Sequence, residues 1–103
     1  TVGWNNGVTM VWVVEAEPGA QPHHTGDIGF HHYAFELDGP EAVDELGDFL
    51  KREGVHIVDP PADYPSYGEG YRAVFFLDPD GLKLEGMYFL EKVKRGGRPP
   101  EPK

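Results

Sequence analysis

Three side chains of this 103-residue sequence, Glu15, His32 and Glu85, are of types that do acid–base or metal chemistry. Glu15 and Glu85 lie in apolar stretches rich in strand-forming residues. A carboxylate inside an apolar strand is costly unless it is paired or binds a metal. An exposed strand face or a sheet edge is the alternative for each carboxylate, and a hydrogen-bonded core histidine is the alternative for His32. Since side chains alternate between strand faces, His32 and Glu85 share a face if Leu84 points toward a covering helix.

The composition narrows the possible partners of these groups. Nine basic and eighteen acidic side chains give a net charge of −9, which disfavours nucleic acid and anionic membrane surfaces. There is no apolar run of membrane-spanning length and no secretory signal pattern. Cys is absent, so the chain has no disulfide, no thiol nucleophile and no cysteine metal ligand. We expect a single small cytoplasmic domain.

The elements that would position these residues follow from turn and period signals. Apolar residues recur at helical spacing between residues 42 and 50, after Pro40 and before Gly54, which predicts a helix over residues 40–53. Asp78-Pro-Asp-Gly81 predicts a tight turn between two antiparallel strands. The expected strands are Val8–Glu15, Ile28–Leu37, Val55–Val58, Tyr71–Leu77 and Leu82–Leu90. The sequence therefore predicts an α+β fold with the order β-α-β-β-β from residue 28.

The two ends of the chain differ in charge. Residues 1–91 carry four basic and seventeen acidic side chains, a net charge of −13, whereas residues 92–103 carry five and one, a net charge of +4. The latter segment is rich in Pro and Gly. We expect a domain over residues 1–91 and a flexible basic tail over residues 92–103.

The segments Phe30-His-His-Tyr-Ala-Phe-Glu-Leu37 and Tyr71–Glu85, with the Asp-Pro-Asp-Gly turn, resemble the vicinal oxygen chelate superfamily. This group includes glyoxalase I, bleomycin-resistance proteins and extradiol dioxygenases. The resemblance implies a βαβββ module over residues 28–89, and residues 1–20 look like the last strands of an incomplete first module. Because two modules pair around the family's cleft, it also implies a homodimer or a partner segment that completes the cleft.

The resemblance implies roles for Glu15, His32 and Glu85. His32 and Glu85 match metal ligands of the family, and Glu15 matches a further ligand that also acts as a base, so Glu15 and Glu85 are the catalytic candidates. Imidazole and carboxylates suit a divalent Zn, Ni, Co, Mn or Fe ion. His31 is expected to point to the opposite strand face and to be a poor ligand.

Several functions fit this resemblance. The first is a metal-dependent glyoxalase-like enzyme that performs isomerase, lyase or thiol-transfer chemistry on a small oxygenated substrate. The second is a non-catalytic binding module of the bleomycin-resistance type, in which aromatic side chains stack on a flat cationic ligand. An extradiol dioxygenase ranks lower because Phe75 stands where that group has Tyr. The remaining hypothesis is a domain that keeps the fold and has lost its activity.

The substrate would meet the loop that precedes Tyr71. Gly-flanked aromatic residues in this loop suit a lid over a ligand, and an ordinary surface connection is the alternative. Tyr67 is a candidate substrate contact. Tyr71 and Arg72 alternate sides at the start of a strand, so one of them should point into the cleft, and Arg72 could bind an anionic group.

Overall fold

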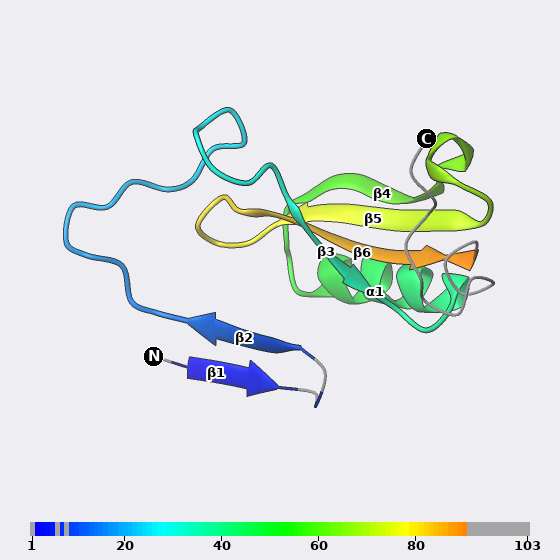
Figure 1. Cartoon of the computed structure of the whole chain (residues 1–103), viewed down its shortest axis with the longest axis horizontal. Coiled ribbons are helices and arrows are strands. Elements are labelled where there is room, and N and C mark those ends of the chain that lie inside the picture. Colours follow the sequence, from blue (N-terminus) through cyan, green and yellow to red (C-terminus); the bar gives the residue numbers. More distant parts are fainter. Residues whose placement is uncertain (1, 6, 8, 91–103) are drawn as a thin grey trace, which may run out of the picture.

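The computed structural model describes residues 2–5, 7 and 9–90, which form two sheets and one α-helix (Figure 1). The elements are β1 (Val2–Asn5), β2 (Met10–Val13), β3 (Tyr33–Glu36), α1 (Pro40–Arg52), β4 (Ile57–Asp63), the 3₁₀ turn η1 (Pro65–Tyr67), β5 (Tyr71–Leu77) and β6 (Lys83–Phe89). The predicted α+β class and the β-α-β-β-β order are confirmed. The predicted tail, residues 92–103, lies outside the described residues.

The main sheet has four strands in the order β3-β6-β5-β4. β3 runs parallel to β6, and the other neighbours are antiparallel, so the sheet is mixed. The predicted turn joins β5 to β6: an Asp78 carboxylate oxygen accepts hydrogen bonds from the N–H groups of Asp80 and Leu82 at 2.9 and 2.8 Å. Gly81 supplies the positive φ of 87° that this turn requires.

Helix α1 covers one face of this sheet, against β4, β5 and β6 (Figure 1). Val43 and Leu50 of α1 form a buried cluster with Val74 of β5. Gly86 of β6 lies directly beneath the helix, because a Cβ added there would lie 2.3 Å from Cδ2 of Leu46. Alternation along β6 then places its odd-numbered residues on the face away from α1, which we call the open face.

Several strands differ from the predicted ranges. β3 begins at Tyr33 rather than at residue 28, because its pairing with β6 begins there, opposite Leu84. β4 continues past Pro60 and Pro61, which the sequence marked as its end. As an edge strand with irregular register, β4 can accommodate residues that donate no backbone hydrogen bond. At the N-terminus, β2 pairs with β1, which agrees with the expectation of strands within residues 1–20, although no range was predicted for β1.

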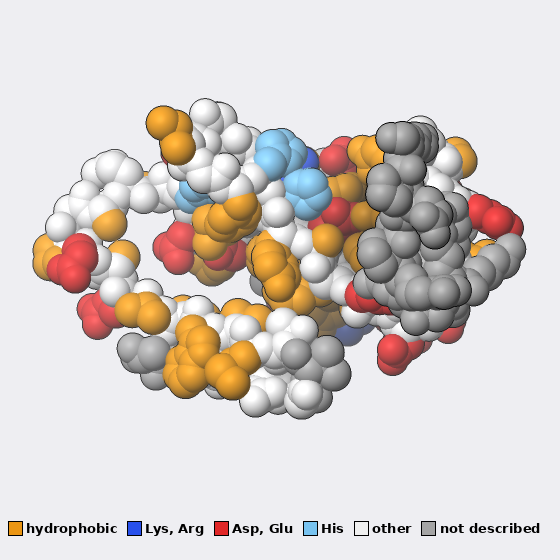
Figure 2. Space-filling model, in the orientation of Figure 1, with side chains coloured by type: hydrophobic (Ala, Val, Ile, Leu, Met, Phe, Trp, Pro, Cys, Tyr) orange, Lys and Arg blue, Asp and Glu red, His pale blue; other side chains and the backbone are white. Residues whose placement is uncertain are grey.

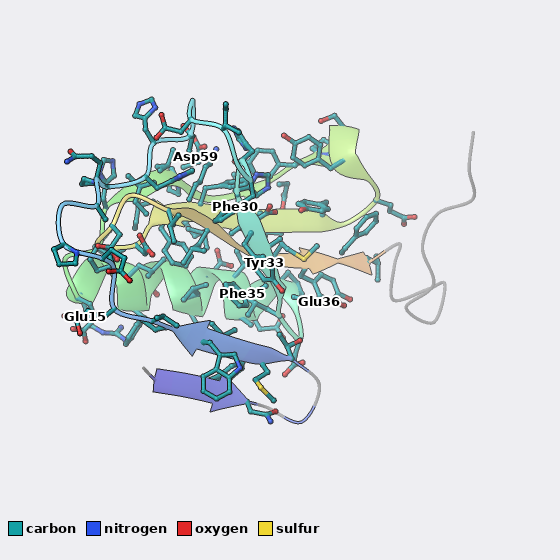
Figure 3. The ribbon with its side chains drawn as sticks, turned by 60° about the vertical axis from the view of Figure 1, so that its left-hand side comes forward. Glu15, Phe30, Tyr33, Phe35, Glu36 and Asp59 are labelled. Carbon is teal, nitrogen blue, oxygen red and sulfur yellow. The ribbon has the colours of Figure 1, made fainter. Side chains whose placement is uncertain are left out.

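The hairpin β1–β2 forms its own two-stranded sheet and lies apart from the main sheet (Figure 1). Trp12 at its centre is 62 % exposed. Tyr33 of β3 is 50 % exposed, and its ring centroid lies 5.0 Å from that of Phe35 on the same strand; Figure 3 labels both residues. β3 is the other edge of the sheet, beyond the strands that α1 mainly covers.

Among the described residues, no helix has the length and apolarity to cross a membrane.

Candidate functional site

The candidate site is built around Glu85 at the middle of β6. Its side chain is 2 % exposed and is the one charged side chain that is buried among the described residues. Strand pairing sets it between Ala34 of β3 and Phe75 of β5, on the open face. A carboxylate withdrawn from water in this way must be hydrogen-bonded or must bind a cation. The sequence-based expectation that Glu85 lies on the face opposite the helix is confirmed.

His32 lies beside this carboxylate, directly before β3. Its Nε2 is 3.0 Å from Oε1 of Glu85, and its side chain is 34 % exposed. The ring stands edge-on to Phe75, with the ring centroids 5.7 Å apart. His32 therefore joins the buried carboxylate to solvent. The predicted pairing of His32 with Glu85 on one face holds in the structure.

The other oxygen of Glu85 is held by Tyr71 at the start of β5. The Tyr71 hydroxyl donates a hydrogen bond to Oε2 of Glu85. Burial, together with this hydrogen bond and the carboxylate charge, raises the pKa of Tyr71 well above its usual value. Tyr71 is thus a phenol that stays protonated and acts as a hydrogen-bond donor on the open face. It is the member of the Tyr71–Arg72 pair that points toward Glu85.

Sequence reasoning missed the contact between His31 and His32. The Nδ1 atoms of the two rings are 2.8 Å apart, with the rings nearly perpendicular at 81°. The expectation that His31 points to the opposite face rested on strand alternation. Both histidines precede β3, which begins at Tyr33, so alternation does not apply to them. The result is a continuous chain of contacts from His31 through His32 and Glu85 to Tyr71.

Aromatic side chains border Glu85 on the side of η1. This aromatic wall consists of Tyr64, Tyr67, Tyr71 and Phe89. The rings of Tyr64 and Tyr67 are stacked at 5.3 Å with an interplanar angle of 7°. Tyr71 stands edge-on to Tyr67 at 5.3 Å and to Phe89 at 5.2 Å. Tyr67, predicted as a substrate contact, is 57 % exposed, so the wall presents a ring edge or face to solvent.

The loop that carries Tyr64 and Tyr67 of this wall is closed by backbone hydrogen bonds. The Tyr64 N–H donates to the Tyr71 carbonyl oxygen at 2.8 Å, and the Tyr71 N–H donates to that of Gly68 at 3.3 Å. Burial is the main cause that raises the pKa of Tyr64, with the charge of Asp59 adding to it. Sequence reasoning noted Tyr64 only as part of the loop. Its position next to a proline-initiated turn was the available signal.

Arg72, the predicted anion-binding residue, lies on the helix side of the sheet. Its guanidinium donates to Asp44 of α1 at 2.6 Å and to Asp63 of β4 at 2.9 Å. These carboxylates raise its pKa. The cation therefore links three elements behind the sheet and does not face Glu85.

Glu15, the third predicted ligand, is exposed in the linker that follows β2. Figure 3 shows it at the far left, well separated from Tyr33 and Phe35 of β3. Within the described residues, no three His, Cys, Asp or Glu side chains are grouped so that they could hold a metal ion. The structure thus brings His32 and Glu85 together and leaves Glu15 apart. In Figure 2 histidine side chains gather beside acidic and hydrophobic ones on the visible face.

Comparison with known proteins extends these observations. The family model of the Glyoxalase/Bleomycin resistance protein/Dioxygenase superfamily matches residues 5–85. An uncharacterized protein of Bacillus subtilis (strain 168), YqjT, is 29 % identical over 90 residues, which are 80 % of this chain and 70 % of that protein.

Two solved structures share the fold. A candidate glyoxalase from Bacillus halodurans has a TM-score of 0.68 and 29 % identity over 84 % of this chain and 66 % of its own. A glyoxalase/bleomycin resistance protein/dioxygenase from Nocardioides has a TM-score of 0.53 and 27 % identity over 87 % of this chain and 50 % of its own. This chain thus spans about two thirds and one half of their lengths. With the family match over residues 5–85, the chain belongs to the Glyoxalase/Bleomycin resistance protein/Dioxygenase superfamily.

Proposed function

We propose that this chain is part of a glyoxalase-like, metal-dependent enzyme that acts on a small oxygenated substrate by isomerase, lyase or thiol-transfer chemistry. The observation that carries the proposal is the 3.0 Å approach of His32 Nε2 to Oε1 of the buried Glu85. Members of the superfamily commonly use a divalent metal ion. The partly exposed imidazole of His32 and the buried carboxylate of Glu85 are suitable donors for such an ion.

His32 and Glu85 are the residues that would hold a shared ion, through the Nε2 and Oε1 atoms that now contact each other at 3.0 Å. Zn, Ni, Co, Mn and Fe all accept this donor pair. When bound, the ion would supply Lewis-acid polarisation of adjacent substrate oxygens.

The remaining groups of the open face have distinct roles in this proposal. Tyr71 holds the second oxygen of Glu85, so the carboxylate keeps one orientation. Tyr71 is protonated at neutral pH, and its raised pKa keeps it protonated into more alkaline conditions. Tyr67 is exposed beside it and would contact the apolar part of the substrate. Arg72 has no part in substrate binding, since two carboxylates hold it behind the sheet.

The site needs further ligands from outside this arrangement. His32 and Glu85 supply two donors, and no third His, Cys, Asp or Glu among the described residues groups with them to hold a metal. We propose that a second copy of the chain, or a partner segment, completes the cleft, with a Glu15 carboxylate from the second copy as one ligand and base. The exposed hairpin β1–β2, with Trp12 at its centre, supports such an association.

Titration with Zn²⁺ and Ni²⁺ in a calorimeter tests the proposal. The parent chain should bind one ion per site, and His32→Ala and Glu85→Gln should each weaken binding by at least tenfold. His56→Ala is the matched control, because His56 is an exposed histidine on the approach to β4. Binding by the two site variants that equals binding by the parent would rule out this metal site.

A second candidate function is favoured by the aromatic wall. The stacked pair Tyr64–Tyr67, in a chain of net charge −9, suits a planar aromatic cation. In that case the chain is a binding module of the bleomycin-resistance type, and ligand binding needs no metal. Binding of a planar cation such as proflavine that survives both EDTA and the His32→Ala substitution would favour this second function.

A further inference from the structure

We propose that Lys83 binds an anionic group of the substrate, a carboxylate or a phosphate, on the open face beside His32 and Glu85. The inference rests on the proposed function, because it takes the substrate to lie on this face, but it involves no metal ion. Lys83 is the first residue of β6 and lies two residues before Glu85, so both side chains lie on the open face. Its Nζ atom is 5.0 Å from the centroid of the Phe75 ring, and Phe75 pairs with Glu85 across the sheet.

The other basic side chains of the described residues lie elsewhere. Lys51 and Arg52 are in the last turn of α1, which covers the opposite face of the sheet. Arg72 lies on that same side, where its guanidinium donates hydrogen bonds to two carboxylates. Among the described residues, Lys83 is therefore the one Lys or Arg side chain on the open face.

The ammonium group of Lys83 has hydrogen-bonding capacity left for a ligand. Within the part of the chain that the structure describes, no carboxylate oxygen lies within 4.0 Å of its Nζ atom. The face of an aromatic ring attracts a cation electrostatically but does not take up its three N–H donors. Lysine binds phosphate and carboxylate oxygens as a compact point charge. An oxyanion can therefore bind Lys83 without displacing an existing partner.

Phe75 brings this cation close to the centre of the candidate site. The Phe75 side chain is 6 % exposed, so packing holds its ring in place. The ring centroid of His32 lies 5.7 Å from that of Phe75, and the Nζ atom of Lys83 lies 5.0 Å from the same centroid. A small molecule that contacts His32 can thus reach the ammonium group as well.

The order of residues along β6 gives such a molecule one orientation. Phe89 lies at one end of the strand, beside Tyr71 of the aromatic wall. Lys83 lies at the other end, and Glu85 lies between them. An apolar group would lie against the wall, oxygen atoms beside His32 and Glu85, and the anionic group at Lys83. The substrate class is accordingly a small oxygenated acid with an apolar substituent.

The acidic character of the chain does not exclude an anion at this position. Exposed charges more than about 8 Å away are largely screened at physiological ionic strength. The net charge of −9 therefore acts weakly at Lys83, whose own charge is in direct contact with the ligand.

Ligand titrations followed by NMR in the presence of EDTA test the inference without a metal ion. Mandelate and phenyl phosphate each carry an aromatic ring and an anionic group, and mandelamide is the neutral counterpart of mandelate. Lys83→Met keeps an unbranched chain over Phe75 and removes the charge. We expect it to lower the affinity for both anions about tenfold, which corresponds to one hydrogen bond with a charged group. Its affinity for mandelamide should equal that of the parent.

Two further variants control this experiment. Lys83→Arg should retain anion binding, because it keeps a cation at the same place. Lys51→Met, which removes an exposed lysine of α1, should bind all three ligands as the parent does. A dispersed NMR spectrum shows that each variant is folded. The anion that binds the parent more tightly identifies the group as a carboxylate or a phosphate.

The inference and the proposed function fail in different measurements. Parent-like binding of both anions by Lys83→Met, an equal loss of mandelate and mandelamide affinity in that variant, or no anion binding by the parent would each overturn the inference. Zn²⁺ calorimetry on Lys83→Met should match the parent. Zn²⁺ binding that does not depend on His32 would overturn the metal site and leave the anion titrations as they are.

Discussion

The hydroxyl of Tyr71 donates a hydrogen bond to Oε2 of Glu85, which joins a phenol on β5 to a buried carboxylate on β6. His32 contacts the other oxygen of the same carboxylate at 3.0 Å. Each oxygen of Glu85 therefore has a partner, which is the condition for keeping a carboxylate at 2 % exposure. The stability of the sheet and the geometry of the candidate site consequently depend on the same residues.

Tyr71→Phe should destabilise the fold. The substitution keeps the ring against Phe89 but leaves Oε2 of Glu85 without its donor. We expect the free energy of unfolding to fall by about 1–3 kcal/mol, the usual cost of an unsatisfied buried polar group. Urea denaturation measures it. Tyr33→Phe, the same change on a half-exposed ring at the sheet edge, is the control and should unfold as the parent does.

The raised pKa of Tyr71 predicts a loss of stability at alkaline pH. Because the folded state favours the protonated phenol, its contribution is complete below the unfolded pKa near 10 and is lost as pH rises through the higher folded value. The free energy of unfolding should therefore decrease as pH rises above about 10. Tyr71→Phe should show a shallower decrease. Identical slopes for the two proteins would contradict the raised pKa.

Arg72→Met should affect stability and not metal binding. The guanidinium bridges Asp44 and Asp63 on the helix side, where it is partly exposed. Ion pairs of this kind contribute little, so we expect a decrease of about 1 kcal/mol or less in the free energy of unfolding, and a smaller one in high salt. Zn²⁺ affinity should match that of the parent. A large drop in Zn²⁺ affinity would mean that Arg72 reaches the open face after all.

The parts of the structure that the sequence predicted are those with strong local signals. The Asp78–Gly81 turn fixed the β5–β6 hairpin, and with it the alternation that places Glu85 away from α1. The helix was bounded by Pro40 and Gly54, close to the observed Pro40–Arg52. A short turn and a capped helix depend mainly on neighbouring residues, so a single sequence was sufficient for them.

The parts that were missed depend on contacts across the chain. The beginning of β3 is set by its pairing with β6, and alternation was wrongly extended from Tyr33 back to His31. The separation of Glu15 from Tyr33 at the start of β3, visible in Figure 3, depends on the path of a long linker, which residue spacing cannot give. The full burial of Glu85 depends on such contacts too, because its partners His32 and Tyr71 lie far from it in the sequence.

Trp12→Lys should dissociate the proposed dimer. Trp12 is exposed at the centre of the hairpin, and a solvent-facing patch of this kind indicates a partner surface. Sedimentation velocity at high concentration should show a dimer for the parent and a monomer for the variant. Val58→Lys is the control, because Val58 is an exposed residue of β4, an edge strand of the main sheet; this variant should remain dimeric. A parent that sediments as a compact monomer would remove the support for a site completed by a second copy.

Tyr67→Ala should remove the ligand-binding surface of the aromatic wall. Tyr67 stacks on Tyr64, stands edge-on to Tyr71 and exposes more than half of its surface, so a planar ligand meets this ring first. Loss of one stacking partner costs roughly 1 kcal/mol, and we expect proflavine affinity, followed by fluorescence, to fall about fivefold. Tyr33→Ala is the matched control, because Tyr33 is similarly exposed but lies outside the wall. If proflavine affinity falls equally in both variants, the dye binds exposed tyrosines in general. The aromatic wall would then not be a specific ligand site. An effect confined to Tyr67→Ala would place the ligand beside Tyr71, within reach of the Glu85 carboxylate that Tyr71 contacts.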